Sequence, residues 1–205
     1  MLKYKIVLAG AKNVGKSSLI ARFCDNVFNE EMMDTIGVAF KRKKMIVDEN
    51  RELDLTIWDF GGEEKYRFLF PSYVNGAAAA LILFDTTRKE TLEDVENWVN
   101  IVDENADENI VKILIATKID LKEERQISIE DAKELCKKYG CYESDAPIGT
   151  SSKTGENVEK AFRKAAEAIM NARLQRCSNC GEIFAKKLKI CNYCGADAEI
   201  KTVQI

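Results

Sequence analysis

The chain has 205 residues, of which 46% are hydrophobic and 32% charged, and its formal net charge is −3. This length suits one domain with at most a small appendage, and the apolar content excludes disorder over most of the chain. Because positive and negative charges nearly balance, a uniformly charged surface of the kind that binds nucleic acid is excluded. The absence of histidine excludes a histidine base and a metal held by histidine. The longest strictly apolar run, residues 77–84, is too short to cross a bilayer, and no signal-peptide pattern precedes the first strand. We therefore expect a cytoplasmic protein.

Short apolar runs alternate with amphipathic stretches over most of the chain. The apolar runs predict strands over residues 5–9, 39–47, 53–59, 79–85, 111–117 and 147–150. The stretches between them predict helices over residues 16–24, 64–74, 91–105, 128–139 and 156–174. The second and third strands are so close in the chain that only an antiparallel hairpin can join them. We therefore predict an α/β fold with a six-stranded mixed sheet, five strands parallel and one antiparallel, flanked by helices.

The cysteines divide the chain into two regions. Four of the seven lie within the last 29 residues, and the other three are scattered. In a reducing compartment we expect the scattered three to pack as small apolar residues. Because the last predicted helix runs almost directly into Cys177, we predict an α/β domain over residues 1–175 and a small cysteine-rich module over residues 176–205.

The strongest motif lies between the first strand and the first helix. Residues 10–17 read GAKNVGKS, which matches G-x-x-x-x-G-K-S in the context that the motif requires. The glycines let backbone N–H groups point at a β-phosphate, Lys16 neutralises phosphate oxygens, and Ser17 ligates Mg²⁺. The alternative is a chance glycine-rich turn. The residues predicted to contact nucleotide here are Gly10, Lys12, Asn13, Val14, Gly15, Lys16, Ser17 and Ser18.

Three further polar motifs follow later strands at the same predicted edge of the sheet. Asp59 ends the third strand, where it can hold a water of the magnesium ion, and the Gly62 amide can meet a γ-phosphate. Asp120 follows the fifth strand and can accept paired hydrogen bonds from guanine N1–H and N2–H₂, donors that adenine lacks. Four such motifs in order at strand carboxyl ends predict a guanine-nucleotide site. Residues 150–154 (TSSKT) follow the last strand and can support guanine O6 with a backbone N–H. The residues assigned to the base are Thr117, Lys118, Asp120, Ser151, Ser152 and Lys153.

With these motifs, residues 3–172 resemble a small GTPase of the Ras superfamily, closest to the Rab branch. Residues 34–40 (DTIGVAF) and 58–67 (WDFGGEEKYR) resemble the two switch segments of Rab proteins. The resemblance implies a P-loop GTPase fold and a monomeric, Mg²⁺-dependent switch that meets effectors, exchange factors and activating proteins. It also implies that Thr35 completes the Mg²⁺ shell when GTP is bound and that Phe28 lies against the guanine.

The residue that should position the attacking water departs from the family pattern. Glu63 stands where the family has Gln, and a carboxylate can accept a hydrogen bond from water but cannot donate one. We therefore expect slow intrinsic hydrolysis, with Lys16, Thr35 and Gly62 as the other catalytic candidates. A nucleotide-dependent scaffold without hydrolysis is the alternative.

Other positions also depart from the pattern. Lys12 stands where Ras has Gly, and it can supply charge, obstruct an arginine finger or point to solvent. Thr117 replaces the Asn of N-K-x-D, as in the Rho branch. Residues 60–62 (FGG) are closer to the Arf pattern than to the Rab pattern, which leaves the branch open.

Three aromatic residues match the positions through which Rab proteins meet effectors, and they can equally pack beneath the switches: Phe40, Trp58 and Tyr73. The last residues carry no C-a-a-X cysteine, and Leu2 excludes N-myristoylation, so we expect no direct lipid anchor.

The cysteine-rich module contains two Cys-x-x-Cys-Gly units, which resemble the knuckles of a zinc ribbon. The predicted ligands of a structural Zn²⁺ ion are Cys177, Cys180, Cys191 and Cys194. Iron in a rubredoxin-like site and paired disulfides are the alternatives. The lysines at 186, 187 and 189 raise RNA binding as a further alternative, although such a run is more often a solvated face. We expect a GTPase switch in trafficking or signalling, with the ribbon as an interaction module.

Overall fold

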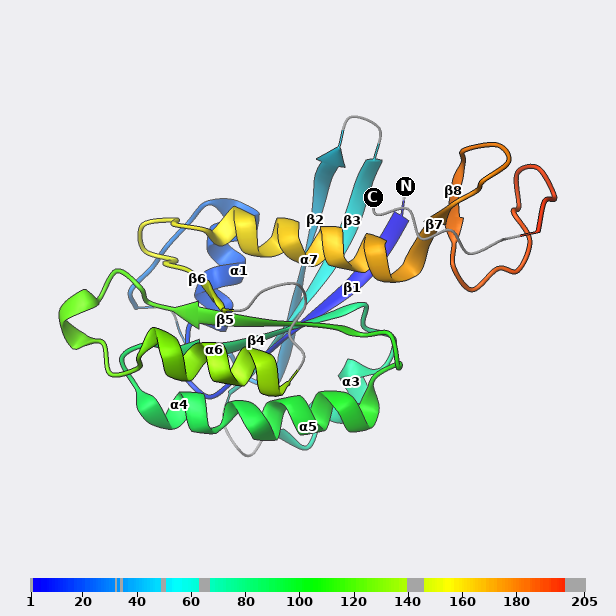
Figure 1. The fold of residues 1–205 in the computed structure, drawn as a ribbon. Helices are drawn as coiled ribbons and strands as arrows, with labels where there is room; N and C mark the ends of the chain where they lie inside the picture. The colour runs from blue at the N-terminus through cyan, green and yellow to red at the C-terminus, as the bar shows by residue number, and fades with distance from the viewer. Residues whose placement is uncertain are drawn as a thin grey trace.

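The computed structural model describes residues 2–31, 33, 35–48, 51–62, 67–139 and 146–197. Within these ranges, six strands form one sheet in the order β2-β3-β1-β4-β5-β6 (Figure 1). They are β1 (Leu2–Ala9), β2 (Val38–Asp48), β3 (Arg51–Phe60), β4 (Ala79–Asp85), β5 (Val111–Thr117) and β6 (Ile148–Gly149). Only the β2–β3 pairing in this sheet is antiparallel among the described residues. The predicted six-stranded mixed sheet is therefore confirmed.

Helices cover both faces of the sheet (Figure 1). They are α1 (Lys16–Asp25), α3 (Phe70–Val74), α4 (Lys89–Glu93), α5 (Val95–Asn105), the 3₁₀ turn η1 (Lys122–Glu124), α6 (Ile129–Lys138) and α7 (Val158–Arg173). One core lies between the sheet and α1 with α7, and a second lies between the sheet and α3 to α6. Strand β1 divides its side chains between them, Ile6 and Leu8 facing the first core and Val7 and Ala9 the second. Because β4 is covered on both faces, all seven of its residues are buried, which explains the apolar run in the sequence.

Two predicted helices differ from those in the structure. The helix predicted over residues 91–105 is two helices that meet at Asp94, whose N–H group reaches the carbonyls of both Glu90 and Leu92 in a tightened turn. The Asp94 carboxylate also accepts the indole N–H of Trp98 at 2.8 Å. Of the helix predicted over residues 64–74, part lies outside the described residues, and α3 contains Pro71 in its first turn, where no N–H is required.

A second, smaller sheet follows α7 without a linker. β7 (Leu174–Arg176) begins directly after Arg173 and pairs antiparallel with β8 (Ile183–Ala185). The predicted domain boundary at residue 175 thus falls inside β7. Leu174 belongs to the core of the large sheet, whereas Phe184 packs with Cys177 in a separate small cluster. Among the helices described, none has the length and apolar character needed to cross a membrane.

Candidate nucleotide and metal sites

The loop between β1 and α1 curls back on itself. Gly10, Asn13 and Gly15 have φ angles of 144°, 61° and 96°. A side chain at Gly10 would also place its Cβ 2.5 Å from the carbonyl oxygen of Leu83, so only glycine fits there. The sequence motif therefore forms the tight loop that it predicts, at the N-terminus of α1.

Lys16 spans this loop from the first turn of α1. Its Nζ donates hydrogen bonds to the carbonyl oxygens of Gly10 at 2.8 Å and Ala11 at 2.9 Å. Burial lowers the pKa of Lys16 to about 8, although the nearby Asp59 carboxylate opposes that shift. Gly62 presses against the same loop, because an added Cβ would lie 2.6 Å from the Lys16 Nζ and from the backbone nitrogen of Lys12. Two of the predicted catalytic residues are therefore in contact.

A cluster of hydroxyl and carboxylate oxygens lies beside Lys16. The Ser17 and Thr35 hydroxyl oxygens are 2.7 Å apart, and both donate to Asp59 Oδ2, at 2.5 Å and 2.9 Å. The other oxygen of this carboxylate, Oδ1, is buried and has no hydrogen-bond partner among the residues described. Hard oxygen ligands of this kind suit Mg²⁺, and the orphaned carboxylate oxygen is one that an ion with its waters can satisfy. The residues present therefore fit the predicted metal.

A cavity opens over the loop and the second switch segment. Its described lining is Lys12, Asn13, Gly15, Lys16, Ser17, Ser18, Met33, Thr35, Phe60 and Gly62. The structure thus brings most of the predicted phosphate and magnesium residues to one place. Glu63, the predicted water-positioning residue, lies outside the described residues, and so does the Asp34 neighbour of Thr35.

Thr117 joins the phosphate loop to the base end of the site. Its buried hydroxyl group lies 2.7 Å from the carbonyl oxygen of Val14 and 2.9 Å from that of Phe84. Lys118, next in the chain, has a φ of 58°. The Thr117 hydroxyl therefore links this motif to the phosphate loop.

The segment after β6 is fixed by α1. Arg22 on α1 donates from Nε to the Ser152 carbonyl and from Nη2 to the Lys153 carbonyl, each at 2.7 Å. Ser151 is fully buried. Lys153 pairs with Glu30 at 2.8 Å, and this hydrogen bond, with a smaller contribution from Asp120, raises the Lys153 pKa.

Asp120 and Phe28, two residues predicted to contact the guanine base, lie outside the cavity over the phosphate loop. Asp120 is half-buried and near enough to Lys153 to influence its pKa. Phe28 is half-buried in the segment that follows α1. Neither lines the cavity described over the phosphate loop.

A charged bridge that the motifs did not predict also contacts the phosphate loop. Asp85, which ends β4 and is fully buried, accepts from Lys118 Nζ at 2.6 Å and from Arg88 Nε at 3.1 Å. Burial alone would raise the pKa of Asp85, but the hydrogen bonds from Lys118 and Thr87 hold it below its usual range. Arg88 Nη2 in turn donates to the Lys12 carbonyl oxygen at 2.8 Å. The available signal was an aspartate at the carboxyl end of a strand, the same signal that identified Asp59.

The three aromatic residues form a continuous row. The Phe40 and Trp58 ring centroids are 5.2 Å apart, and those of Trp58 and Tyr73 are 5.4 Å apart. Trp58 and Tyr73 pack against the second core, but the Phe40 residue is 60% exposed. Trp58 and Tyr73 therefore pack as the core interpretation predicts, Phe40 is exposed, and contact with effectors stays a prediction.

The four cysteines of the tail converge on one point. The sulfur atoms of all four lie within 4.8 Å of one another, with 3.7 Å between Cys177 and Cys194 and 3.7 Å between Cys180 and Cys191. Four sulfurs at about 2.3 Å around a tetrahedral Zn²⁺ lie roughly 3.8 Å apart, whereas a disulfide requires about 2.05 Å.

The two cysteine turns have the same backbone design. The N–H groups of Gly181 and Gly195 return to the carbonyls of Cys177 and Cys191 at 3.0 Å and 2.9 Å, and both glycines have positive φ. Hydrogen bonds from the Asn179 amide and from a backbone N–H lower the pKa of Cys194, whereas, despite a backbone hydrogen bond at Glu182, burial and hydrogen bonds to the neighbouring cysteines raise the pKa of Cys180. The geometry therefore fits a closed four-thiolate metal site.

Comparison with known proteins agrees with these motifs. A family model described as "Ras family" matches residues 5–171. The chain is 38% identical over 177 residues to "Ras-related protein Rab-1" of Theileria parva, which covers 86% of this chain and 78% of that protein. It is 40% identical over 166 residues to "Ras-related protein YPTC6" of Chlamydomonas reinhardtii, covering 81% and 74%. With "Ras-related protein Rab11A" of Lotus japonicus the identity is 37% over 168 residues, covering 82% and 72%. The chain therefore belongs to the Ras family of small GTPases, and Rab proteins are among its relatives.

Proposed function

We propose that this GTPase is a Mg²⁺-dependent switch that hydrolyses GTP to GDP and phosphate slowly on its own, and that its two nucleotide states are read by effector proteins. One observation supports this most. Ser17, Thr35 and Asp59 gather their oxygens beside Lys16, and a buried Asp59 oxygen lacks a partner within the described part of the chain. The Rab relatives support a role in trafficking or signalling.

In this proposal each residue of the loop has one task. Lys16 exchanges its two carbonyl partners for phosphate oxygens, and the loop N–H groups bind the β-phosphate. Thr35 and Gly62 sense the γ-phosphate, because both lie against the loop from segments outside it. A bound Mg²⁺ supplies positive charge that stabilises the phosphate oxygens.

Slow hydrolysis follows from the chemistry of Glu63. A carboxylate at that position adds negative charge near the transferred phosphate and cannot donate a hydrogen bond to it. We propose that Asp120 selects guanine, with Lys118 and the buried Ser151 segment supporting the base. Exposed Phe40, with Trp58 and Tyr73 beside it, offers the surface that effectors read.

For the tail, we propose that the four cysteines hold one structural Zn²⁺ and that residues 176–205 serve as an interaction module. The 3.7 Å sulfur separations and the matched glycine turns support this. A shell of four thiolates leaves no open position for water, so the ion stabilises the fold of the tail and takes no part in hydrolysis.

Calorimetric titration of the nucleotide-free chain with GDP and ADP tests the nucleotide proposal. We expect Mg²⁺-dependent binding of GDP and no measurable binding of ADP. The variant Asp120→Asn should lose GDP affinity and gain affinity for xanthosine diphosphate, because an amide complements the carbonyl that replaces the guanine amino group. Asp103→Asn is the control, since this exposed carboxylate pairs with Lys112 away from the site. Equal binding of ADP and GDP, or an unchanged GDP affinity in Asp120→Asn, would contradict the assignment.

A further inference from the structure

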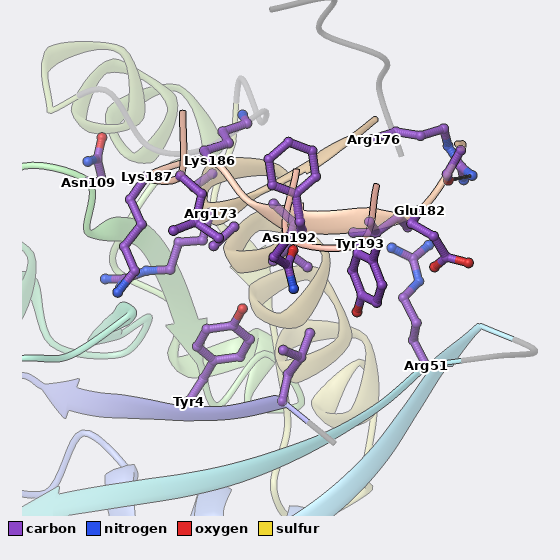
Figure 2. Close-up of a pocket in the computed structure, with 18 of the residues that line it drawn as sticks. Tyr4, Arg51, Asn109, Arg173, Arg176, Glu182, Lys186, Lys187, Asn192 and Tyr193 are labelled. Atoms are coloured by element: carbon purple, nitrogen blue, oxygen red, sulfur yellow. Dashed lines mark hydrogen bonds between the residues drawn. The ribbon is translucent and has the colours of Figure 1, made fainter. Parts of the chain in front are cut away.

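A large cavity separates the cysteine-rich hairpin from the main sheet. Its volume is about 1270 Å³, and Figure 2 shows it between the chain around Asn192 and Tyr193 and the strands that carry Tyr4 and Arg51. Tyr4 and Arg51 lie at the beginning of β1 and β3, so the cavity lies at the amino ends of the parallel strands. The nucleotide residues lie at the carboxyl ends, which is the opposite edge of the sheet (Figure 1).

The walls of the cavity are fixed by the fold. Leu174, at the base of the hairpin, is 5% exposed and packs in the core of the large sheet. The N–H group of Lys186 donates to the carbonyl of Arg173 at 2.8 Å, which ties the end of β8 to the end of α7. Phe184 packs on Cys177 and Cys191 inside the hairpin. The hairpin is therefore anchored to the body, and the cavity is a built feature of the molecule.

Positive charge dominates the cavity. Five of the described lining residues are cationic and two are acidic, although the chain as a whole has a net charge of −3. The cationic residues are Arg51, Arg173, Arg176, Lys186 and Lys187. Lys187 and Arg173 lie toward one end and Arg51 and Arg176 toward the other (Figure 2). Arg176 donates to the backbone carbonyl of Gly181 and Lys186 to that of Asn171, and a neutral carbonyl does not cancel the charge of a cation. Arg173, in contrast, pairs with the Asp107 carboxylate of the same lining at 3.8 Å.

The same lining carries apolar surface between the charges. Ile183 comes from β8, Leu2 from β1, and Leu188 and Tyr193 from the loops of the hairpin. Leu2, Leu188 and Tyr193 are 37%, 38% and 61% exposed, which is unusual for large side chains grouped around one cavity. A phosphate group or a lipid headgroup would bind the cationic side chains and leave this apolar surface exposed to solvent. A peptide that alternates acidic and apolar side chains would use both.

We propose that this cavity is a docking site for an acidic, partly apolar segment of a partner protein, bound in extended form. The proposal rests on the zinc-stabilised module proposed above. The volume of the cavity exceeds the 300–1,000 Å³ typical of small-molecule pockets and suits a short peptide. Charge complementarity identifies the partner chemistry, and the location identifies the role: the segment binds at the edge opposite the nucleotide, so the switch surface stays open for an effector.

Fluorescence anisotropy with a labelled peptide of alternating glutamate and leucine tests the proposal, using the full chain with its zinc content and GDP binding verified first. We expect saturable binding that weakens with added salt, and no binding of a matched glutamine–leucine peptide. Lys187→Glu should weaken binding about tenfold, because it reverses one charge inside the cavity. Lys189→Glu is the matched control, since Lys189 is an exposed lysine of the same loop that does not line the cavity.

Four results would overturn the proposal. The first is no peptide binding by a zinc-replete, GDP-binding chain. The second is binding that Lys187→Glu and Lys189→Glu weaken equally. The third is a preference for vesicles that contain phosphoinositide over the peptide, with the same dependence on Lys187, which would identify a lipid headgroup as the occupant. A chain that binds the peptide only after deletion of residues 198–205 would likewise show that its own segment fills the cavity. Absence of zinc from the purified chain would instead contradict the module itself.

Discussion

Gly62 fits against the phosphate loop because it has no side chain. A Cβ at this position would lie 2.6 Å from the Ala11 carbonyl oxygen, from the Lys12 nitrogen and from the Lys16 Nζ. Two of these atoms belong to the backbone of a loop whose own conformation is fixed by Gly10, so they cannot move aside cheaply. Any side chain here must therefore push the second switch segment away from the loop.

The variant Gly62→Ala tests whether this contact senses the γ-phosphate. We expect affinity for a non-hydrolysable GTP analogue to fall about tenfold, because one hydrogen bond to a charged group is worth roughly 1.5–3 kcal/mol. GDP affinity should change less than about twofold, since GDP lacks the phosphate concerned. Both values come from one calorimetric series, in which GDP binding serves as the internal control for folding. Equal losses for the two nucleotides would show that Gly62 supports the loop and does not sense the γ-phosphate.

Arg88 acts on the loop through its backbone. It joins the buried Asp85 carboxylate to the Lys12 carbonyl oxygen, at 3.1 Å and 2.8 Å. We expect Arg88→Ala to speed the release of GDP about fivefold, because a lost hydrogen bond costs about 1 kcal/mol. Stopped-flow release of fluorescently labelled GDP measures this rate, and Arg88→Lys should restore part of it.

Arg163→Ala is the matched control for the Arg88 variant. Arg163 also donates to backbone carbonyls, those of Ile46 and Val47, but it lies on α7 away from the phosphate loop. If both arginine variants released GDP equally fast, the effect would come from general loss of stability, and the positioning role of Arg88 would be wrong.

Among the helices and strands, the features that the sequence predicts correctly are those set by local residue patterns. Strands β4 and β5 begin and end at the predicted residues, because an apolar run buried on two faces has sharp limits. Ser128, the first residue of the predicted helix, caps α6 by accepting the Asp131 N–H at 3.0 Å, and α6 itself begins one residue later. The glycines of the phosphate loop and of the cysteine turns are likewise demanded by local backbone geometry.

Features that depend on contacts between residues far apart in the sequence could not be predicted from local sequence patterns. The division between α4 and α5 falls at Asp94, whose carboxylate also pairs with Arg67 at 2.8 Å across the second core. Asp85 and Arg88 matter because of their contacts with Lys118 and Lys12, which are remote in sequence. The cavity beside the tail depends on how the hairpin is anchored to α7, which no periodicity encodes.

The β7–β8 hairpin is too small to hold its shape without the cysteine cluster. Its strands have three residues each, and its own buried cluster consists of Cys177, Phe184 and Cys191. The free energy of metal binding should therefore be the free energy of folding for this element.

Removal of the metal tests this dependence. After treatment with a zinc chelator under reducing conditions, we expect amide hydrogens of residues 177–197 to exchange rapidly, including the Cys177 N–H that now bonds to Glu182 at 2.8 Å. Exchange in the second half of β1, residues 6–9, should stay slow, because these residues are buried in the large sheet. Mass-spectrometric exchange measures both in one sample. Cys180→Ser should mimic the chelator, whereas Cys24→Ser, outside the cluster, should not. Continued protection of the tail without metal would show that packing alone holds it.

At the scale of the whole molecule, two sites lie at opposite edges of one sheet (Figure 1). The nucleotide residues follow the carboxyl ends of β1, β3 and β5, whereas the cysteine cluster follows α7 at the amino ends. The central strands between the two edges form continuous ladders around a buried core, so we expect the body to keep its fold without the tail.

Truncation after Arg176 separates the two sites in a single experiment. This cut keeps Leu174, which fills the core of the large sheet, and removes all four cysteines. We expect GDP affinity and single-turnover GTP hydrolysis to change less than about twofold, since no described residue beyond Arg176 lines the phosphate cavity. Binding of the acidic peptide should disappear, because Lys186, Lys187 and the apolar wall of β8 are lost with the tail. Far-ultraviolet circular dichroism controls for folding of the shortened chain. If the truncated chain kept its helical signal but released GDP much faster, the tail would have to act on the nucleotide site through the sheet, and the independence of the two edges would be wrong.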